Sequence, residues 1–201
     1  MKCLPIVHRA VLVALVLLAG ACSSSPPVRY YTLGTGPVGE KSDAPSRPAG
    51  GYTVAVGPVA VPATVDRPQI VIQIDPNRVA MLDDQRWAEP LSSAISRTVA
   101  SDLGKLLGVS TVLFPRDSMI DVKYRVAIEI RNFVSVPGEA ATIDATWTVF
   151  GPKDAVTRGQ RLAHETVTKA DYEALAQAHT RALMSISRDV AASIASQEAA
   201  H

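Results

Sequence analysis

The stretches Val122-Lys-Tyr-Arg-Val-Ala-Ile-Glu-Ile-Arg131 and Ala141-Thr-Ile-Asp-Ala-Thr-Trp-Thr-Val149 decide the fold. Apolar and polar side chains alternate in both, which is the pattern of strands with one buried and one solvated face. Pro137 and Gly138, two typical turn residues, stand between them. The sequence therefore predicts an antiparallel hairpin in the second half of the chain.

Two amphipathic helices are predicted, one before this hairpin and one after it. The first covers Pro90–Leu107, with proline at its first position and Gly108 as its stop signal. The second runs from Tyr172 to about Ser196 and follows Asp171, a favourable N-cap residue. Apolar residues recur every three or four positions in both helices, so each has one face to bury.

Shorter runs rich in strand-forming residues predict further strands. They are Arg29–Leu33, Tyr52–Val59, Ile70–Ile74, Arg78–Leu82, Val109–Phe114 and Gly159–Thr168. Asp83 and Asp84 are predicted to form a polar turn before the first helix. Together the elements predict an α+β two-layer sandwich, in which a mixed, mostly antiparallel sheet of five to seven strands carries both helices on one face.

Residues 1–21 have the anatomy of a signal peptide. Positive residues near the start precede the unbroken apolar run Ala10–Ala19, and the small residues Gly20 and Ala21 follow it. The apolar run is short for a membrane-spanning helix, which argues against the alternative of a permanent N-terminal anchor.

The stretch Leu18-Ala-Gly-Ala-Cys22 resembles a lipobox, the processing site of bacterial lipoproteins. The resemblance implies a diacylglyceryl group and an N-acyl chain on Cys22, after removal of residues 1–21. Ser23, in place of aspartate, implies transfer to the outer membrane. We expect a lipidated tether over residues 22–28 and a single domain over residues 29–198, with a flexible loop at 34–51.

Composition argues against several classes of function. Hydrophobic residues make up 47% and charged residues 19%, as in ordinary globular proteins. Removing residues 1–21 removes two basic residues and no acidic one, which leaves 18 basic and 19 acidic side chains. Nucleic-acid binding needs clustered positive charge and is not expected. Cys22, alone in the mature chain, excludes an internal disulfide or a zinc–cysteine cluster.

The sequence contains no recognisable catalytic constellation. No nucleophile elbow, phosphate-binding glycine loop or paired metal-ligand motif is present. His164, His179 and His201 have no neighbouring ligand at metal-binding spacing, so they are predicted to be surface or hydrogen-bonded core residues. We therefore expect no catalytic residue, no metal and no cofactor besides the covalent acyl groups.

Two motifs stand out as candidate sites, Asp66-Arg-Pro-Gln69 and Arg86-Trp-Ala-Glu-Pro90. Tryptophan and arginine together are common anchors of protein interfaces. The alternative is structural, with Trp87 filling the core under the helix start. We expect the two motifs to share a surface. The hypothesis is that Arg67 and Glu89 join one polar cluster near Trp87, pairing within the chain or across a homo-oligomer interface.

Both motifs also carry a family resemblance, together with the lipobox. The order of Tyr-Tyr-Thr-Leu33, Val-Gly-Pro-Val-Ala-Val-Pro62, Asp-Arg-Pro-Gln-Ile-Val71 and Arg-Trp-Ala-Glu-Pro-Leu91 resembles the ABC-type transport auxiliary lipoproteins, the PqiC-like family. The resemblance spans essentially the whole mature chain. Its site residues are Asp66, Arg67, Pro68, Gln69, Arg86, Trp87, Glu89 and Pro90.

The resemblance implies a non-enzymatic periplasmic lipoprotein on the outer membrane. Such proteins work with an MCE-type protein and an ABC permease and ATPase that move lipid between two membranes and support envelope integrity. A homo-oligomer is expected. Two alternatives are open: a carrier whose own domain binds lipid, and a structural or assembly lipoprotein unrelated to transport.

Overall fold

A computed structural model of the protein describes residues 26–34, 51–114 and 121–200. The predicted signal peptide, Cys22 and most of the predicted 34–51 loop lie outside these ranges. The strands are β1 (Arg29–Tyr31), β2 (Thr53–Ala60), β3 (Gln69–Asp75), β4 (Arg78–Trp87), β5 (Ser110–Leu113), β6 (Tyr124–Val136), β7 (Ala140–Phe150) and β8 (Val156–Thr166). The helices are α2 (Leu91–Leu107), the short 3-10 turn η1 (Pro152–Asp154) and α3 (Tyr172–Ala199).

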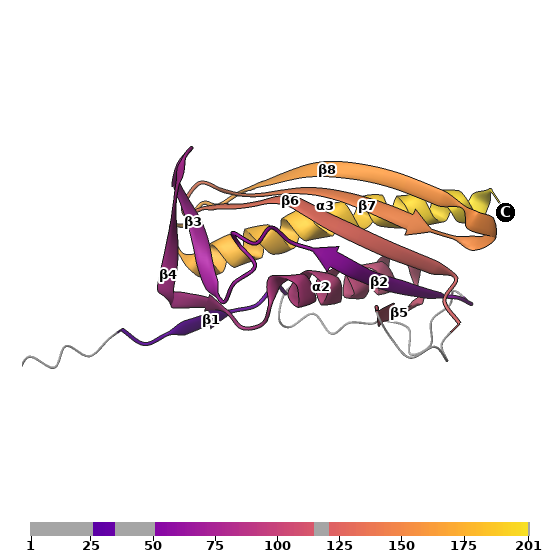
Figure 1. Cartoon of the computed structure of the whole chain (residues 1–201), viewed down its shortest axis with the longest axis horizontal. Helices are drawn as coiled ribbons and strands as arrows, with labels where there is room; N and C mark the ends of the chain where they lie inside the picture. The colour runs from indigo at the N-terminus through magenta and orange to yellow at the C-terminus, as the bar shows by residue number, and fades with distance from the viewer. Residues whose placement is uncertain (1–25, 35–50, 115–120, 201) are drawn as a thin grey trace, which may run out of the picture.

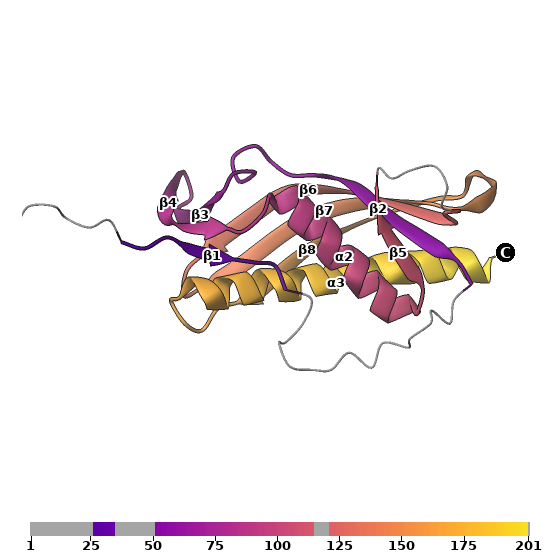
Figure 2. The ribbon, with the colours of Figure 1, turned by 90° about the horizontal axis from the view of Figure 1, so that it is seen from below.

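The larger sheet has five strands in the order β5-β2-β6-β7-β8. The predicted hairpin is its centre: β6 and β7 pair antiparallel, with Ile128 opposite Trp147. The side chains predicted to face inward in β7, from Ala141 to Val149, are all buried. Helices α2 and α3 cover one face of this sheet (Figures 1 and 2), so the predicted α+β sandwich is confirmed.

The remaining strands form a second sheet, which the sequence did not separate from the first. It has the order β1-β4-β3 and stands at one end of the molecule (Figure 1). The predicted turn at Asp83 and Asp84 is wrong, because β4 continues through both residues to Trp87. Strand β1 pairs parallel with Gln85–Trp87, and this pairing holds the segment extended.

The two helices agree with the sequence prediction. Helix α2 follows Pro90 and ends at Gly108, whose φ of 62° suits glycine. The Asp171 carboxylate accepts a hydrogen bond of 2.6 Å from the Ala174 amide at the start of α3. The 28 residues of α3 extend about 42 Å at 1.5 Å per residue. Helix α3 therefore carries the C-terminus to the end opposite the three-stranded sheet (Figure 1).

We predict that Gly159→Ala destabilises the protein. A Cβ at Gly159 would lie 2.3 Å from the Cζ2 atom of the buried Trp147 indole, which α3 fixes through Ser193. Overpacking of this kind costs about 1–3 kcal/mol, which corresponds to a fall in melting temperature of several degrees in a domain of this size. Circular dichroism melting curves measure it. Gly51→Ala is the matched control, because a Cβ there meets no atom within 4 Å. Equal melting temperatures for the two variants would contradict the prediction.

Candidate functional site

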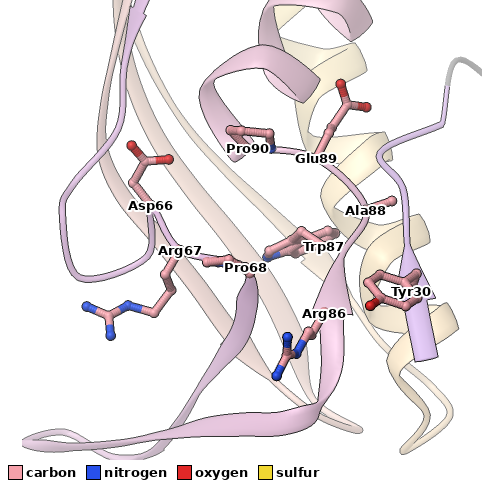
Figure 3. A pocket seen from close by; sticks show the side chains of 9 residues that line it. All are labelled: Tyr30, Asp66, Arg67, Pro68, Arg86, Trp87, Ala88, Glu89 and Pro90. Carbon is pink, nitrogen blue, oxygen red and sulfur yellow. The ribbon is translucent and has the colours of Figure 1, made fainter. Parts of the chain in front are cut away.

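The two sequence motifs line one surface pocket of about 520 Å³ (Figure 3). The volume is typical of small-molecule and ligand sites, which run from roughly 300 to 1,000 Å³. The loop before β3, the end of β4 and the start of α2 supply most of the wall. Its lining residues are Tyr30, Asp66, Arg67, Pro68, Arg86, Trp87, Ala88, Glu89 and Pro90.

The shared surface expected from the sequence is thus present, with one omission and one addition. Gln69 is not part of the lining; it is the first residue of β3 and pairs with Arg86 across the sheet. Tyr30 of β1 was not predicted to join the site. Its only sequence signal was the Tyr-Tyr-Thr-Leu33 stretch, and the parallel pairing of β1 with β4 that brings it to the pocket joins segments far apart in the chain.

Trp87 forms both a wall of the pocket and part of the core. Its side chain is 5% exposed and packs edge-to-face against Phe133 and His179, at 6.1 and 6.3 Å between ring centroids. Phe133 and His179 stack on each other at 3.9 Å. The Trp87 amide donates to the Pro68 carbonyl at 2.7 Å, which ties the two motifs together through the backbone.

Arg67 and Arg86 are held by neutral groups. Arg67 donates to the Thr64 and Ala63 carbonyls and to the Met81 sulfur. Arg86 donates through Nε to the Asp83 carbonyl at 3.0 Å. Among the described residues neither guanidinium forms an ion pair, so the pocket keeps two positive charges that no carboxylate neutralises.

The carboxylate of Glu89 pairs with a different arginine from the one that the sequence suggested. It forms an ion pair with Arg97, the seventh residue of α2, and not with Arg67. The in-chain form of the predicted Arg67–Glu89 pair is therefore wrong, although both residues line the pocket. The reason is helical geometry: Arg97 lies in the second turn of α2, partly exposed, and Glu89 lies two residues before the helix begins.

His179 packs against the buried side of the Trp87 ring. It is fully buried in α3, and one ring nitrogen, Nε2, lies 2.8 Å from the Ser135 hydroxyl. Burial lowers the pKa of His179 to about 3, so the ring is neutral at physiological pH. The sequence prediction of a hydrogen-bonded core histidine is confirmed here, and His164 is likewise hydrogen-bonded, at 2.8 Å to the Thr142 hydroxyl.

The described part of the chain offers no group of three or more histidine, cysteine or acidic side chains that could hold a metal ion. Within the same residues no helix is long and apolar enough to cross a membrane. The pocket lining combines guanidinium groups, carboxylates, prolines and two aromatic rings, without a histidine or cysteine beside a hydroxyl. This composition suits binding.

The fold and the pocket define the class: an α+β sandwich protein with a pocket of arginine, carboxylate and aromatic side chains at the end where its N-terminal strand lies. The chain belongs to the family of ABC-type transport auxiliary lipoprotein components, whose model matches residues 31–191. The family predicted from the sequence is therefore confirmed. No curated protein matches this chain.

Two solved structures share the fold. An uncharacterized protein superposes with a TM-score of 0.67 at 18% identity, covering 84% of this chain and 99% of its own. A protein from Xanthomonas campestris superposes with a TM-score of 0.63 at 18% identity, covering 88% of this chain and 97% of its own. At such identity these similarities show the fold alone.

We predict that Glu89 couples to Arg97 and not to Arg67. Both side chains of the Glu89–Arg97 pair are partly solvent-exposed, so the coupling free energy should be no more than about 1 kcal/mol. Double-mutant cycles on unfolding free energy, with alanine at each position, measure it. The Arg67/Glu89 cycle should be additive, and a larger coupling there than in the Arg97/Glu89 cycle would contradict the structure.

We predict that acid destabilises the protein through His179. The folded-state pKa of about 3 lies below the unfolded value near 6.5, so the unfolded chain binds the proton first and stability falls as pH drops below about 6.5. Between pH 7 and pH 5 the loss should be about 2 kcal/mol relative to His179→Gln, which does not titrate. Urea unfolding at both pH values measures it. Buried Asp102 is present in both proteins, so its own titration cancels; parallel pH profiles would refute the assignment.

Proposed function

We propose that this protein is a non-enzymatic, lipid-anchored component of an ABC/MCE-type intermembrane lipid-transport system. It docks that system to the outer membrane and supports envelope integrity. The family supplies the association with ABC-type transport. The observation that carries the docking role is the placement of the N-terminal strand and both motifs at one end of an elongated domain (Figure 1).

The tether length limits where the domain can lie. Only residues 23–28 separate Cys22 from β1, and six extended residues reach about 20 Å. With acyl chains on Cys22, the end of the domain that carries β1 stays close to the membrane. Helix α3 leads away from that end over about 42 Å. An anchored protein of this size cannot cross the periplasm by itself, so a partner supplies the rest of the bridge.

The pocket fits binding, because backbone carbonyls hold the guanidinium groups of Arg67 and Arg86 in place, and Arg97 neutralises Glu89. A carrier that encloses whole lipid chains is less well supported. The face of the large sheet under the helices is filled by packed side chains such as Leu103, Ile143 and Leu183, each fully buried.

We predict that Cys22→Ser leaves an unprocessed precursor that still carries residues 1–21. Affinity purification of the tagged wild-type protein from detergent-solubilised envelopes should recover an MCE-type protein and an ABC permease and ATPase, and Cys22→Ser should recover much less. Mass spectrometry of the mature N-terminus tests the anchor separately. An unmodified Cys22, or a wild-type purification without any transport component, would overturn the proposal.

Ser23→Asp offers a second test, of location. If the residue after the acylated cysteine directs sorting, this variant should move from the outer-membrane to the inner-membrane fraction of a sucrose density gradient. Ser24→Asp is the matched control, with the same charge one residue further along, and should fractionate like the wild type. An unchanged Ser23→Asp distribution would argue against outer-membrane sorting by this signal.

A further inference from the structure

We propose that the pocket binds the phosphate-bearing headgroup of a phospholipid in the membrane that anchors the protein. Arg67 and Arg86 contact the phosphate, and exposed apolar side chains of the β3–β4 hairpin contact the glycerol and the first acyl carbons. The inference rests on the proposed lipid anchor and names what the anchored end of the domain touches.

The two arginines of the pocket keep unused hydrogen-bonding capacity. A guanidinium carries five N–H donors. Arg67 uses three of them and Arg86 one, so both keep donors for a ligand. The backbone carbonyls that accept these bonds also fix the orientation of each guanidinium, which lowers the entropic cost of binding. Arginine in this state is the side chain best suited to phosphate oxygens.

The charges of the pocket lining also favour an anionic ligand. Arg97 neutralises Glu89, so the unneutralised groups of the lining are Arg67, Arg86 and Asp66, with a surplus of one positive charge. A phosphodiester with one negative charge complements that surplus. Figure 3 shows both guanidinium groups on one side of Trp87 and Pro68, and the Asp66 and Glu89 carboxylates on the other. The positive side of the pocket is thus separated from its acidic side.

An exposed apolar surface continues from Arg67 along the β3–β4 hairpin. The Met81 sulfur accepts a hydrogen bond from Arg67 at 2.9 Å, and Met81 is 53% exposed. Val79, two residues away and therefore on the same face of β4, is 55% exposed. Five of the ten exposed large hydrophobic residues in the described part of the chain lie in or beside this small sheet: Val28, Tyr30, Ile74, Val79 and Met81. A cationic pocket that borders an apolar ridge matches the order of phosphate and acyl chain in a phospholipid.

The pocket lies close in sequence to the proposed lipid anchor. Tyr30 lines the pocket and is the eighth residue after Cys22, so the pocket lies within about 28 Å of the anchor. Strand β1 pairs with the last three residues of β4, and the described residues before β1 lead out at the end of the domain that carries the β3–β4 hairpin (Figure 1). The start of β1, the pocket and the hairpin thus share one end of the domain. A protein partner that arrives from the other membrane would meet the opposite end first, so a membrane lipid is the better-supported occupant.

The test uses the mature lipoprotein, purified in a non-ionic detergent and titrated with dihexanoyl phosphatidylglycerol. Native mass spectrometry counts the bound lipid. Two probes separate the contribution of the phosphate from that of the acyl chains. Dihexanoylglycerol has the same acyl chains without phosphate, and inorganic phosphate has no apolar part. We expect one lipid bound per chain, at least about tenfold more tightly than either probe.

The variant Arg67→Gln/Arg86→Gln should weaken lipid binding by about tenfold or more, because it removes both charged donors. Arg158→Gln is the control; Arg158 is exposed on β8, remote from the pocket, and should leave binding unchanged. Arg67→Lys/Arg86→Lys keeps the charge but loses the planar guanidinium that can donate two hydrogen bonds to one phosphate. This variant should bind with intermediate affinity. Val79→Gln, on the exposed ridge, should weaken lipid binding several-fold without affecting phosphate. Melting curves establish that each variant is folded.

Three results would overturn the inference. The first is equal lipid affinity in the wild type and in the folded double glutamine variant. The second is equal affinity for the lipid and for either probe, which would indicate a free-phosphate site or a purely apolar one. The third is a double variant that loses the transport complex in the affinity purification but keeps its lipid affinity, which would make the pocket a protein-binding site. The proposed function fails differently, through an unmodified Cys22 or a wild-type purification without transport components.

Discussion

Burial of the Trp87 indole is the constraint on which the rest of the candidate site depends. The ring closes the core above Phe133 and His179, and its backbone amide is bonded to the Pro68 carbonyl. The same residue ends β4, pairs with Tyr31 of β1 and leads directly into the loop before α2. Removing the ring would open a cavity where the two sheets and α3 meet. Its hydrogen bond to Pro68 and its pairing with Tyr31 tie both motifs and β1 to this one packed residue.

The two roles considered for Trp87 from the sequence, core residue and binding-site residue, are therefore compatible. One edge of the indole packs inside the protein while another faces the pocket, as its small exposed fraction allows. This arrangement gives the pocket a rigid aromatic wall beside its two arginines. Amphipathic rings at the boundary of a core commonly serve both purposes.

The sequence predicted most of what local patterns determine. The β6–β7 hairpin followed from alternation, and α2 and α3 followed from apolar spacing and from Pro90, Gly108 and Asp171. It could not show that β1 and β4 pair, because parallel pairing between distant segments leaves no periodic signal. For the same reason the sequence predicts a turn at Asp83 and Asp84 and leaves Tyr30 outside the site. The predicted pairing of Glu89 with Arg67 is wrong because Arg97 belongs to a helix whose orientation the sequence does not give.

The parallel pairing of β1 with β4 also has a mechanical consequence. A pull on the N-terminal side of β1 acts along the strand, so the hydrogen bonds to β4 and the bond from the Ala88 amide to the Tyr31 carbonyl are loaded in shear and share the force. Just beyond, Leu33 is fully buried, and its carbonyl accepts a bond from the Thr98 hydroxyl of α2. Tension applied at the start of the chain is thereby passed into the helical layer of the domain, and the short strand acts as a clamp against peeling.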